Sequence, residues 1–162
     1  MSIERFILFS GIIIFIGALL YIPKGQLRKA LLAFILFQAT TWSISLVLVQ
    51  MDILQFPLRE FPKATGSVFI PQFFIYPAFF TWFYLCLPYK PSKLYRTLHW
   101  LISISMPVYF AYFIAIYTDL SQFTKGSLIR NLVYLYAEFS FQYVVCFRYL
   151  KWFYSVEKGK VN

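Results

Sequence analysis

The sequence has few charged residues and almost none of the side chains on which most enzymes rely. Charged residues make up 13% of the 162 residues, and only 6 of them are acidic. Soluble domains contain about 25% charged residues. The one histidine, His99, and the 2 cysteines, Cys86 and Cys146, lack the spacing of a metal site. No HExxH, GxSxG, P-loop, CxxC or dinucleotide-binding motif occurs. We therefore expect no cofactor, no metal site and no enzymatic activity.

Apolar and aromatic residues dominate instead. Hydrophobic residues make up 60% of the chain, aromatic residues 23%, and the mean hydropathy is +0.67. In water such a chain would expose large apolar patches and aggregate, whereas lipid tails accept apolar side chains. There is no internal repeat, linker or low-complexity stretch. The composition predicts an all-α, polytopic membrane helix bundle that forms a single domain over residues 1–162.

Long apolar runs separated by short polar turns predict five transmembrane helices. A bilayer-spanning helix needs about 20 mostly apolar residues. The five runs lie at about residues 6–22, 30–51, 67–87, 98–118 and 130–150. Gly11 and Gly17 in the first run allow another helix to approach closely. An alternative has four spans, with the fifth run lying on the membrane surface because a charge interrupts it.

The basic residues separate into two unequal groups when five spans are assumed. The larger group of ten comprises Lys24, Arg28, Lys29, Lys90, Lys93, Arg96, Arg148, Lys151, Lys158 and Lys160. The smaller group of five comprises Arg5, Arg59, Lys63, Lys125 and Arg130. The positive-inside rule predicts a plasma-membrane protein with its N-terminus outside and its C-terminus in the cytoplasm. The net charge of +9 then indicates contacts with anionic lipids at the cytoplasmic loops, and we expect no nucleic-acid partner.

Glu138 is the acidic residue placed deepest in a predicted span. Along a helix it lies roughly 12 Å from Arg130 and 15 Å from Arg148. An ionisable group near the bilayer midplane is costly and is by default a candidate functional site. One interpretation is a protonatable carboxyl that binds or passes a proton or a cationic substrate. The other is a hydrogen-bonded Glu138 that ties the fifth helix to Gln38, Thr41 or Gln72.

Two polar stripes accompany Glu138 at helical spacing. Residues three or four positions apart share a helix face. The stripe on the fifth run consists of Asn131, Tyr134, Glu138 and Gln142, and the stripe on the second run of Gln38, Thr41 and Ser45. We expect both stripes to face other helices rather than lipid. Our candidate intramembrane polar site is Glu138, Gln142, Gln38, Gln72 and Tyr76.

Two prolines, Pro71 and Pro77, bracket Gln72 and Tyr76 in the third run. An interior proline frees a carbonyl group and bends the helix. The segment is interpreted either as a broken helix that lines a transport site or as a kink set by packing. The preceding loop, residues 52–66, is semi-apolar and is expected to lie along the membrane surface. The part of this loop that holds its charges comprises Arg59, Glu60, Pro62 and Lys63. This part either recognises a partner or is a solvated loop.

Three features of the chain carry a resemblance. They are the Phe61–Pro62 pair in the outer loop, the run from Phe69 to Pro77 that opens a helix, and the five-span layout. Together they resemble a group of small multi-pass membrane proteins of spore-forming Gram-positive bacteria. The resemblance implies a bacterial plasma membrane and brings no established activity. From the residues themselves we expect a structural or partner-binding membrane component. The alternative is a small proton-coupled transporter or channel subunit, and a pore would need several copies or a membrane-protein partner. A third class, a membrane enzyme, would need a second essential polar residue at the depth of Glu138.

Overall fold

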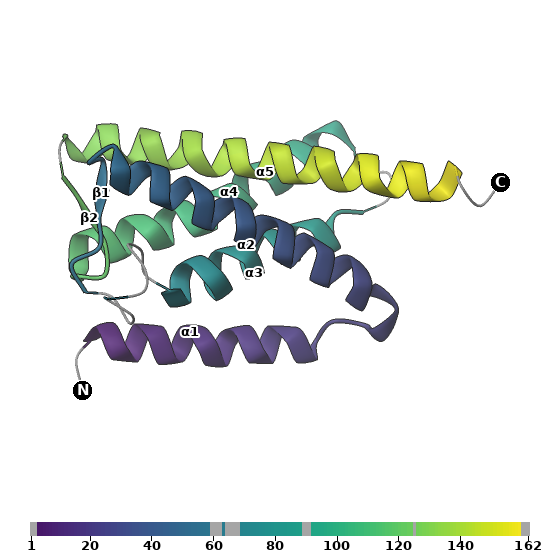
Figure 1. Cartoon of the computed structure of the whole chain (residues 1–162). Coiled ribbons are helices and arrows are strands. Elements are labelled where there is room, and N and C mark those ends of the chain that lie inside the picture. Colours follow the sequence, from purple (N-terminus) through teal and green to yellow (C-terminus); the bar gives the residue numbers. More distant parts are fainter. Residues whose placement is uncertain (1–2, 59–62, 64–68, 89–91, 125, 160–162) are drawn as a thin grey trace.

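Five helices form an all-helical bundle (Figure 1). The structure is a computed structural model that describes residues 3–58, 63, 69–88, 92–124 and 126–159. Within these residues the helices are α1 (Ile3–Leu20), α2 (Leu27–Gln50), α3 (Tyr76–Cys86), α4 (Lys93–Tyr117) and α5 (Leu128–Gly159). A 3-10 turn, η1 (Lys24–Gln26), precedes α2, and a π-helical turn, η2 (Pro71–Ile75), precedes α3. The all-α prediction is confirmed.

Two helical segments of the described chain are long and apolar enough to cross a bilayer by length and composition, Lys24–Gln50 and Lys93–Tyr117. A shorter apolar stretch, Phe6–Gly17, lies in α1. The run in α5 is interrupted by charged residues, and α3 alone has only 11 residues. Helices therefore occur at all five expected positions. By length and composition alone, however, two of the helical segments qualify as candidate membrane spans, not five.

Two helix ends differ from the sequence prediction. α4 begins at Lys93 rather than near Leu98, because the Ser92 hydroxyl accepts a hydrogen bond from the Tyr95 N–H at 3.2 Å and caps the helix. α5 continues to Gly159 rather than ending near residue 150. The basic, aromatic tail that follows the fifth predicted span is therefore largely a helical extension of it.

The connections gather at two opposite ends of the bundle. Figure 1 shows the strands at the end where α2 and α4 finish and α5 begins, with the C-terminus at the other end. β1 (Leu54–Gln55) pairs antiparallel with β2 (Gln122–Phe123), and Leu54 lies opposite Phe123. Two further bonds extend the pairing, from Leu58 N–H to the Asp119 carbonyl at 3.0 Å and from Thr124 N–H to the Ile53 carbonyl at 3.2 Å. We call residues 53–58 and 118–124 the cap.

A tight helix ending directs the chain from α2 into the cap. Asp52 has a φ of 53°, the left-handed conformation that commonly ends helices. The Ile53 N–H donates to the Leu48 carbonyl at 3.0 Å and the Asp52 N–H to the Val49 carbonyl at 3.1 Å. These two bonds form a Schellman motif and satisfy carbonyl groups that the helix end would leave unpaired.

Two side chains of the first cap strand segment, Leu54 and Phe56, are buried, whereas Gln55, Pro57 and Leu58 are exposed. The expected position of this loop along the membrane surface stays a prediction. The side chains of Leu54 and Phe56 are buried against Leu8 of α1, Ile114 of α4 and Leu120 of the cap. The pairing of β1 with β2 leaves these side chains facing the helices, and burying apolar area favours that arrangement. The cap thus closes one end of the bundle.

An aromatic cluster fills the bundle on the side away from the cap. Phe37 of α2 stacks on Phe80 of α3, with ring centroids 4.7 Å apart. Tyr143 of α5 packs edge-on against both rings, at 5.3 Å and 5.1 Å. Phe83 lies 5.1 Å from Tyr143 and 4.7 Å from Trp100 of α4. Edge-to-face and offset-stacked pairs of this kind add to the free energy of apolar burial.

The turn η2 connects α1 to the bundle. The Tyr76 N–H bonds to the Pro71 carbonyl, which is the i to i+5 pattern of a π-helix. Ile75 of this turn packs over Gly11 of α1, where a Cβ atom would lie 2.5 Å from the Ile75 Cδ1. Phe74 contacts Phe15 of α1 at a centroid distance of 5.3 Å. The expected close approach therefore occurs at Gly11, whereas no atom lies within 4 Å of a Cβ built on Gly17.

Candidate functional site

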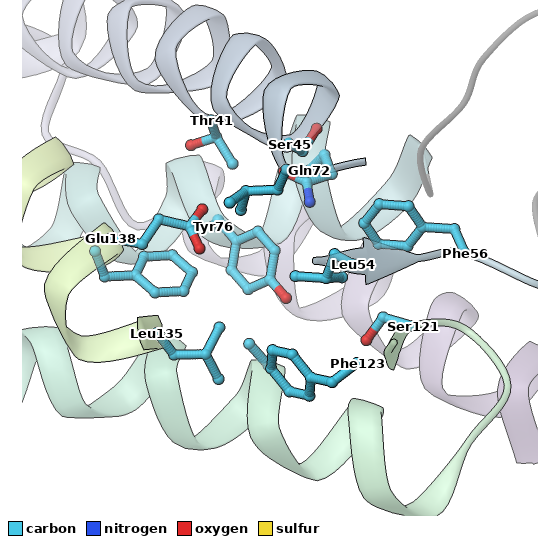
Figure 2. A pocket seen from close by; sticks show the side chains of 13 residues that line it. Thr41, Ser45, Leu54, Phe56, Gln72, Tyr76, Ser121, Phe123, Leu135 and Glu138 are labelled. Atoms are coloured by element: carbon cyan, nitrogen blue, oxygen red, sulfur yellow. The ribbon is translucent and has the colours of Figure 1, made fainter. Parts of the chain in front are cut away.

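A small cavity lies beneath the cap, where α2, η2, α3 and α5 meet (Figure 2). Its volume is about 30 Å³, enough for one or two water molecules. Its polar lining comprises Thr41, Ser45, Gln72, Tyr76, Ser121 and Glu138. Its apolar lining comprises Leu48, Leu54, Phe56, Ala111, Phe123, Leu135 and Phe139. We call this space the Glu138 cavity.

Glu138 is joined to α2 through a buried glutamine. Gln142 lies one helical turn further along α5, and its Nε2 donates to the Glu138 Oε1 at 3.0 Å. The Thr41 hydroxyl of α2 donates to the Gln142 Oε1 at 2.8 Å. Gln142 is fully buried and Thr41 nearly so. The two bonds form one chain, Thr41 to Gln142 to Glu138, that crosses from α2 to α5.

Gln72 and Tyr76 enter the cavity from η2 and the start of α3. Both side chains are buried. The Gln72 Oε1 has no hydrogen-bond partner among the described residues, and an unsatisfied buried oxygen is destabilising. In Figure 2 the carboxyl group of Glu138 is directed toward Tyr76, and Gln72 lies between Ser45 and Tyr76. The π-turn therefore brings both predicted residues to Glu138.

Hydroxyl groups from two further positions complete the polar lining. Ser45 of α2 is buried, and its hydroxyl donates to the Trp42 carbonyl at 2.9 Å. Ser121 comes from the cap. Glu138 is the only Asp, Glu, Lys, Arg or His among the described residues that line the cavity. Any positive charge that balances an ionised Glu138 must therefore come from outside this lining.

Four of the five predicted site residues come together, and Gln38 does not. Glu138, Gln72 and Tyr76 line the cavity, and Gln142 bonds to Glu138 behind it. Gln38 is half-buried and lies outside the lining. A step of three residues rotates about 300° around a helix, so Gln38 points about 60° away from Thr41.

The same geometry corrects one member of the stripe on α5. Asn131 and Gln142 are buried, but half of the surface of Tyr134 is exposed. Tyr134 precedes Glu138 by four residues and follows Asn131 by three, which places it at the edge of the stripe. The stripe that faces the bundle is therefore narrower than its sequence spacing indicates.

Sequence reasoning missed the part of the site that the cap supplies. Leu54, Phe56, Ser121 and Phe123 line the cavity from two connections that were expected to be surface loops. The available signal was the semi-apolar character of residues 52–58. Thr41 and Ser45 were predicted to face other helices, and that prediction is confirmed by their burial.

A second, wider hollow also has Phe123 in its lining. Its volume is about 460 Å³. Glu4, Asp119 and Asn131 contribute polar groups to it, and Phe123 lines both this hollow and the Glu138 cavity. The side chain of Gln122 donates to Asp119 Oδ1 at 2.9 Å. We call this space the outer hollow, after the side of the membrane on which the sequence predicts it.

The remaining candidate residues lie away from the Glu138 cavity. His99 Nε2 lies 3.0 Å from the Phe83 carbonyl, and its ring stacks on that of Phe83. Cys86 and Cys146 are free, and the Cys146 sulfur lies 3.4 Å from the Thr40 hydroxyl. Of the outer-loop residues predicted as a recognition site, Lys63 is exposed, whereas Arg59, Glu60 and Pro62 lie outside the described residues.

The described lining offers one carboxyl group, one amide chain and several hydroxyl groups around a small, partly open space. General acid–base catalysis of hydrolysis commonly uses a second carboxyl or an imidazole, and the described lining supplies neither. In the described part of the chain no three His, Cys, Asp or Glu side chains gather as a metal-binding group. This lining can hold or release a proton, or surround one small ion.

No protein-family model matches the chain, and comparisons with curated proteins and with solved structures find no similar protein. The resemblance to small multi-pass proteins of spore-forming bacteria therefore stays a prediction. The fold and the site define an all-helical bundle that has one carboxyl group in a small capped cavity.

Proposed function

We propose that this chain is a five-span integral protein of a bacterial plasma membrane and acts as a small, proton-coupled transporter or channel subunit without enzymatic activity. The observation that carries this proposal is the Glu138 cavity, in which a lone carboxyl group shares about 30 Å³ with hydroxyl and amide groups. Pockets for organic ligands usually measure about 300–1,000 Å³. A proton, a water molecule or a small ion fits this space, and an organic substrate does not.

The surface of the bundle supports the membrane setting. Large apolar side chains are exposed on α1, α2, α4 and α5, among them Ile13 at 70%, Leu101 at 59% and Phe141 at 62%. Such a surface is suited to lipid tails and would promote association in water. The same exposed faces are available for contact with a second copy or with another membrane protein.

Helix length supports five spans rather than two. At about 1.5 Å per residue, the 18 residues of α1 and the 32 of α5 extend about 27 Å and 48 Å. The helical segment formed by Phe69–Ile70, η2 and α3 ends at Cys86 and extends about as far as α1. The hydrocarbon core of a bilayer is about 30 Å thick. Each of the five can therefore cross it, with the charges of α5 accommodated inside the bundle or at its ends.

The end of the bundle away from the cap fits the cytoplasmic membrane surface. A hollow of about 700 Å³ lies there between α2, α3, α4 and α5. Lys29, Arg96 and Lys151 line it, and the Lys29 ammonium lies 6.0 Å from the centre of the Tyr154 ring. Basic pockets of this kind suit the head groups of anionic lipids. The arrangement favours an outer N-terminus and a cytoplasmic C-terminus.

Reporter fusions test the membrane topology. A reporter that is active only in the cytoplasm, fused after residue 159, should be active, and the same reporter fused before α1 should be inactive. If α5 lies on the membrane surface instead, only four helices cross and the C-terminal fusion should be inactive. Recovery of the full-length protein in the soluble fraction after carbonate washing would contradict the membrane proposal itself.

Proton flux tests the role of Glu138. Protein reconstituted in liposomes with a pH-sensitive dye should carry protons when a potential is applied, and Glu138→Gln should reduce the rate to that of empty liposomes. The neutral amide has nearly the same shape but cannot release a proton at this position. Equal rates for the two proteins would remove the transport role.

A structural role for Glu138 is the second candidate. The chain of hydrogen bonds from Thr41 through Gln142 to Glu138 joins α2 to α5, as in a partner-binding or structural component whose polar residues only hold helices together. In that case Glu138→Gln should carry no functional loss, and disruption of Gln142 should separate the helices.

A further inference from the structure

We propose that the Glu138 cavity binds one dehydrated monovalent cation of sodium size, and that this cation and a proton compete for Glu138. The inference rests on the proposed transport role and specifies its ion. It is carried by the size of the cavity, the charge of its lining and the direction of its hydrogen bonds.

Size restricts the occupant. The cavity has a volume of about 30 Å³, whereas one water-sized occupant needs at least about 10–15 Å³ by the same measure. A cation that kept a full hydration shell would not fit beside the surrounding side chains. An ion in this space must therefore exchange most of its water for protein oxygens.

Charge restricts the occupant to a monovalent cation. Glu138 is the only Asp, Glu, Lys, Arg or His among the described lining residues. Glu138 is half-buried, and a carboxylate that is partly withdrawn from water, in a lining without a positive charge, favours a proton or a counter-ion. One monovalent cation makes the pair neutral, whereas a divalent cation would leave a net positive charge in the same low-dielectric space.

The hydroxyl groups of the lining are suited to act as ligands of a cation. The Thr41 hydroxyl gives its only proton to Gln142, and the Ser45 hydroxyl gives its proton to the Trp42 carbonyl. Toward any further partner both hydroxyls can therefore act only as acceptors. Hard cations bind to oxygen ligands of this type, and sodium sites in transporters use similar groups at interrupted helices.

Gln72 provides an independent indication of a ligand. Its side chain is 7% exposed, it lines the cavity, and its Oε1 has no hydrogen-bond partner among the described residues. Buried polar atoms are satisfied in the great majority of native structures. A cation in the cavity would satisfy this oxygen together with the carboxyl group of Glu138.

Competition with protons involves few other titratable groups. α2 contributes the hydroxyls of Thr41 and Ser45, α4 contributes Ala111, and the cap contributes Ser121. Tyr76 of α3 is the only other titratable side chain in the described lining. Release of a proton from Glu138 is therefore coupled to entry of the cation rather than to a charge change on a neighbour.

The outer hollow offers a route to the cavity. Phe123 lines both spaces, so the two spaces are adjacent. Glu4 and Asp119 line the outer hollow, and the Arg130 side chain lies beside its Gly126. Among the described residues at this entrance, the two carboxylates attract cations, and Arg130 opposes them in part.

Equilibrium binding of radioactive sodium to the purified full-length protein tests the proposal. Choline chloride keeps the ionic strength constant. Choline is chosen because it is too large to enter the cavity and compete with sodium. We expect one saturable site per chain, weaker binding as the pH is lowered, and loss of the site in Glu138→Gln. Thr41→Val and Ser45→Ala should each weaken sodium binding about tenfold. The matched controls Thr40→Val and Ser43→Ala, whose hydroxyls lie outside the lining, should bind as the natural protein does.

Three results would overturn the proposal. Sodium binding that persists in Glu138→Gln would place the site elsewhere. Displacement by choline at equal concentration would show binding to surface charge only. Absence of saturable sodium binding, in a protein whose liposomes still carry protons through Glu138, would mean that Glu138 handles protons alone. That last result would leave the proposed transport role intact, whereas loss of proton flux together with sodium binding would remove both.

Discussion

The two halves of the bundle are packed in opposite ways. On the side away from the cap, Phe37, Phe80 and Tyr143 fill the space between three helices with rings 4.7 Å to 5.3 Å apart. Beneath the cap, the same helices enclose a cavity of about 30 Å³ around Glu138. α2 and α5 run through both halves, so their residues change from aromatic to polar within a few turns.

This difference indicates that the aromatic half stabilises the fold, and under the proposed function the half beneath the cap handles the ion. Dense aromatic packing contributes directly to stability. A cavity with a carboxyl group and an unsatisfied amide oxygen does not, because buried polar groups that lack partners are destabilising. Substitutions should therefore affect stability in one half and ion handling in the other.

The largest loss of stability is expected in the aromatic half. Phe80→Ala should lower the free energy of unfolding by about 3–5 kcal/mol, since it removes a fully buried ring and leaves a cavity. Equilibrium unfolding in mixed micelles measures it. Phe141→Ala is the control, because Phe141 is mainly exposed and should change stability little. Equal losses in the two variants would mean that the aromatic half is not a packed core.

An intermediate loss is expected where the halves meet. Thr41→Val keeps the shape of the side chain but removes the donor to Gln142, which leaves a buried acceptor unpaired and should cost about 1–3 kcal/mol. Thr40→Val removes a hydroxyl that bonds mainly to backbone carbonyls of its own helix and should cost less. A larger cost for Thr40→Val would contradict the bond chain to Glu138.

Glu138→Gln should change stability by less than about 1 kcal/mol, because the amide can still accept a hydrogen bond from Gln142 and needs no counter-ion. The same variant should lose proton flux and sodium binding. Comparison of unfolding curves with flux rates separates the two effects. A large loss of stability with unchanged flux would favour the structural role instead.

The smallest effect is expected at the contact between α1 and η2. Alanine in a helix is favoured over glycine by about 0.5–1 kcal/mol. Gly17→Ala should show this gain, because nothing lies near its new Cβ, whereas Gly11→Ala meets the Ile75 side chain and should lose most of it. The difference between the two unfolding midpoints is the quantity to measure. A larger gain for Gly11→Ala would mean that α1 does not rest on Ile75.

Hydropathy and helical spacing were enough to place the five helices and the face of α5 that carries Glu138. The spacing also indicated the faces of Thr41 and Ser45, because residues four apart differ by only about 40° around a helix. Gln38 and Tyr134 each lie at the edge of their stripe and outside the lining of the cavity. A polar stripe identifies one face of a helix but not the helix that this face contacts. The sequence therefore did not distinguish the hydrogen bond between Thr41 and Gln142 from other possible pairs of polar side chains.

The cap and the helix ends could not be derived from local pattern. The pairing of Leu54 with Phe123 joins segments that are far apart in the sequence, and strands of two residues have no periodicity to detect. The helix end at Asp52 uses a left-handed residue that is neither Gly nor Asn, the residues that usually mark such an end. The cavity depends on the cap, and its size was therefore beyond sequence reasoning.

Carbodiimide labelling of Glu138 in native membranes, in sodium-free buffer across a range of pH, tests the central claim most directly. This reagent modifies protonated carboxyl groups in apolar surroundings, and Glu138→Gln gives the background. We predict labelling at low pH that falls with a clear midpoint as the pH rises, as expected of a carboxyl that exchanges protons within the bundle. Absence of labelling at every pH in the folded protein would contradict the account, and Glu138 would then be a sequestered structural residue.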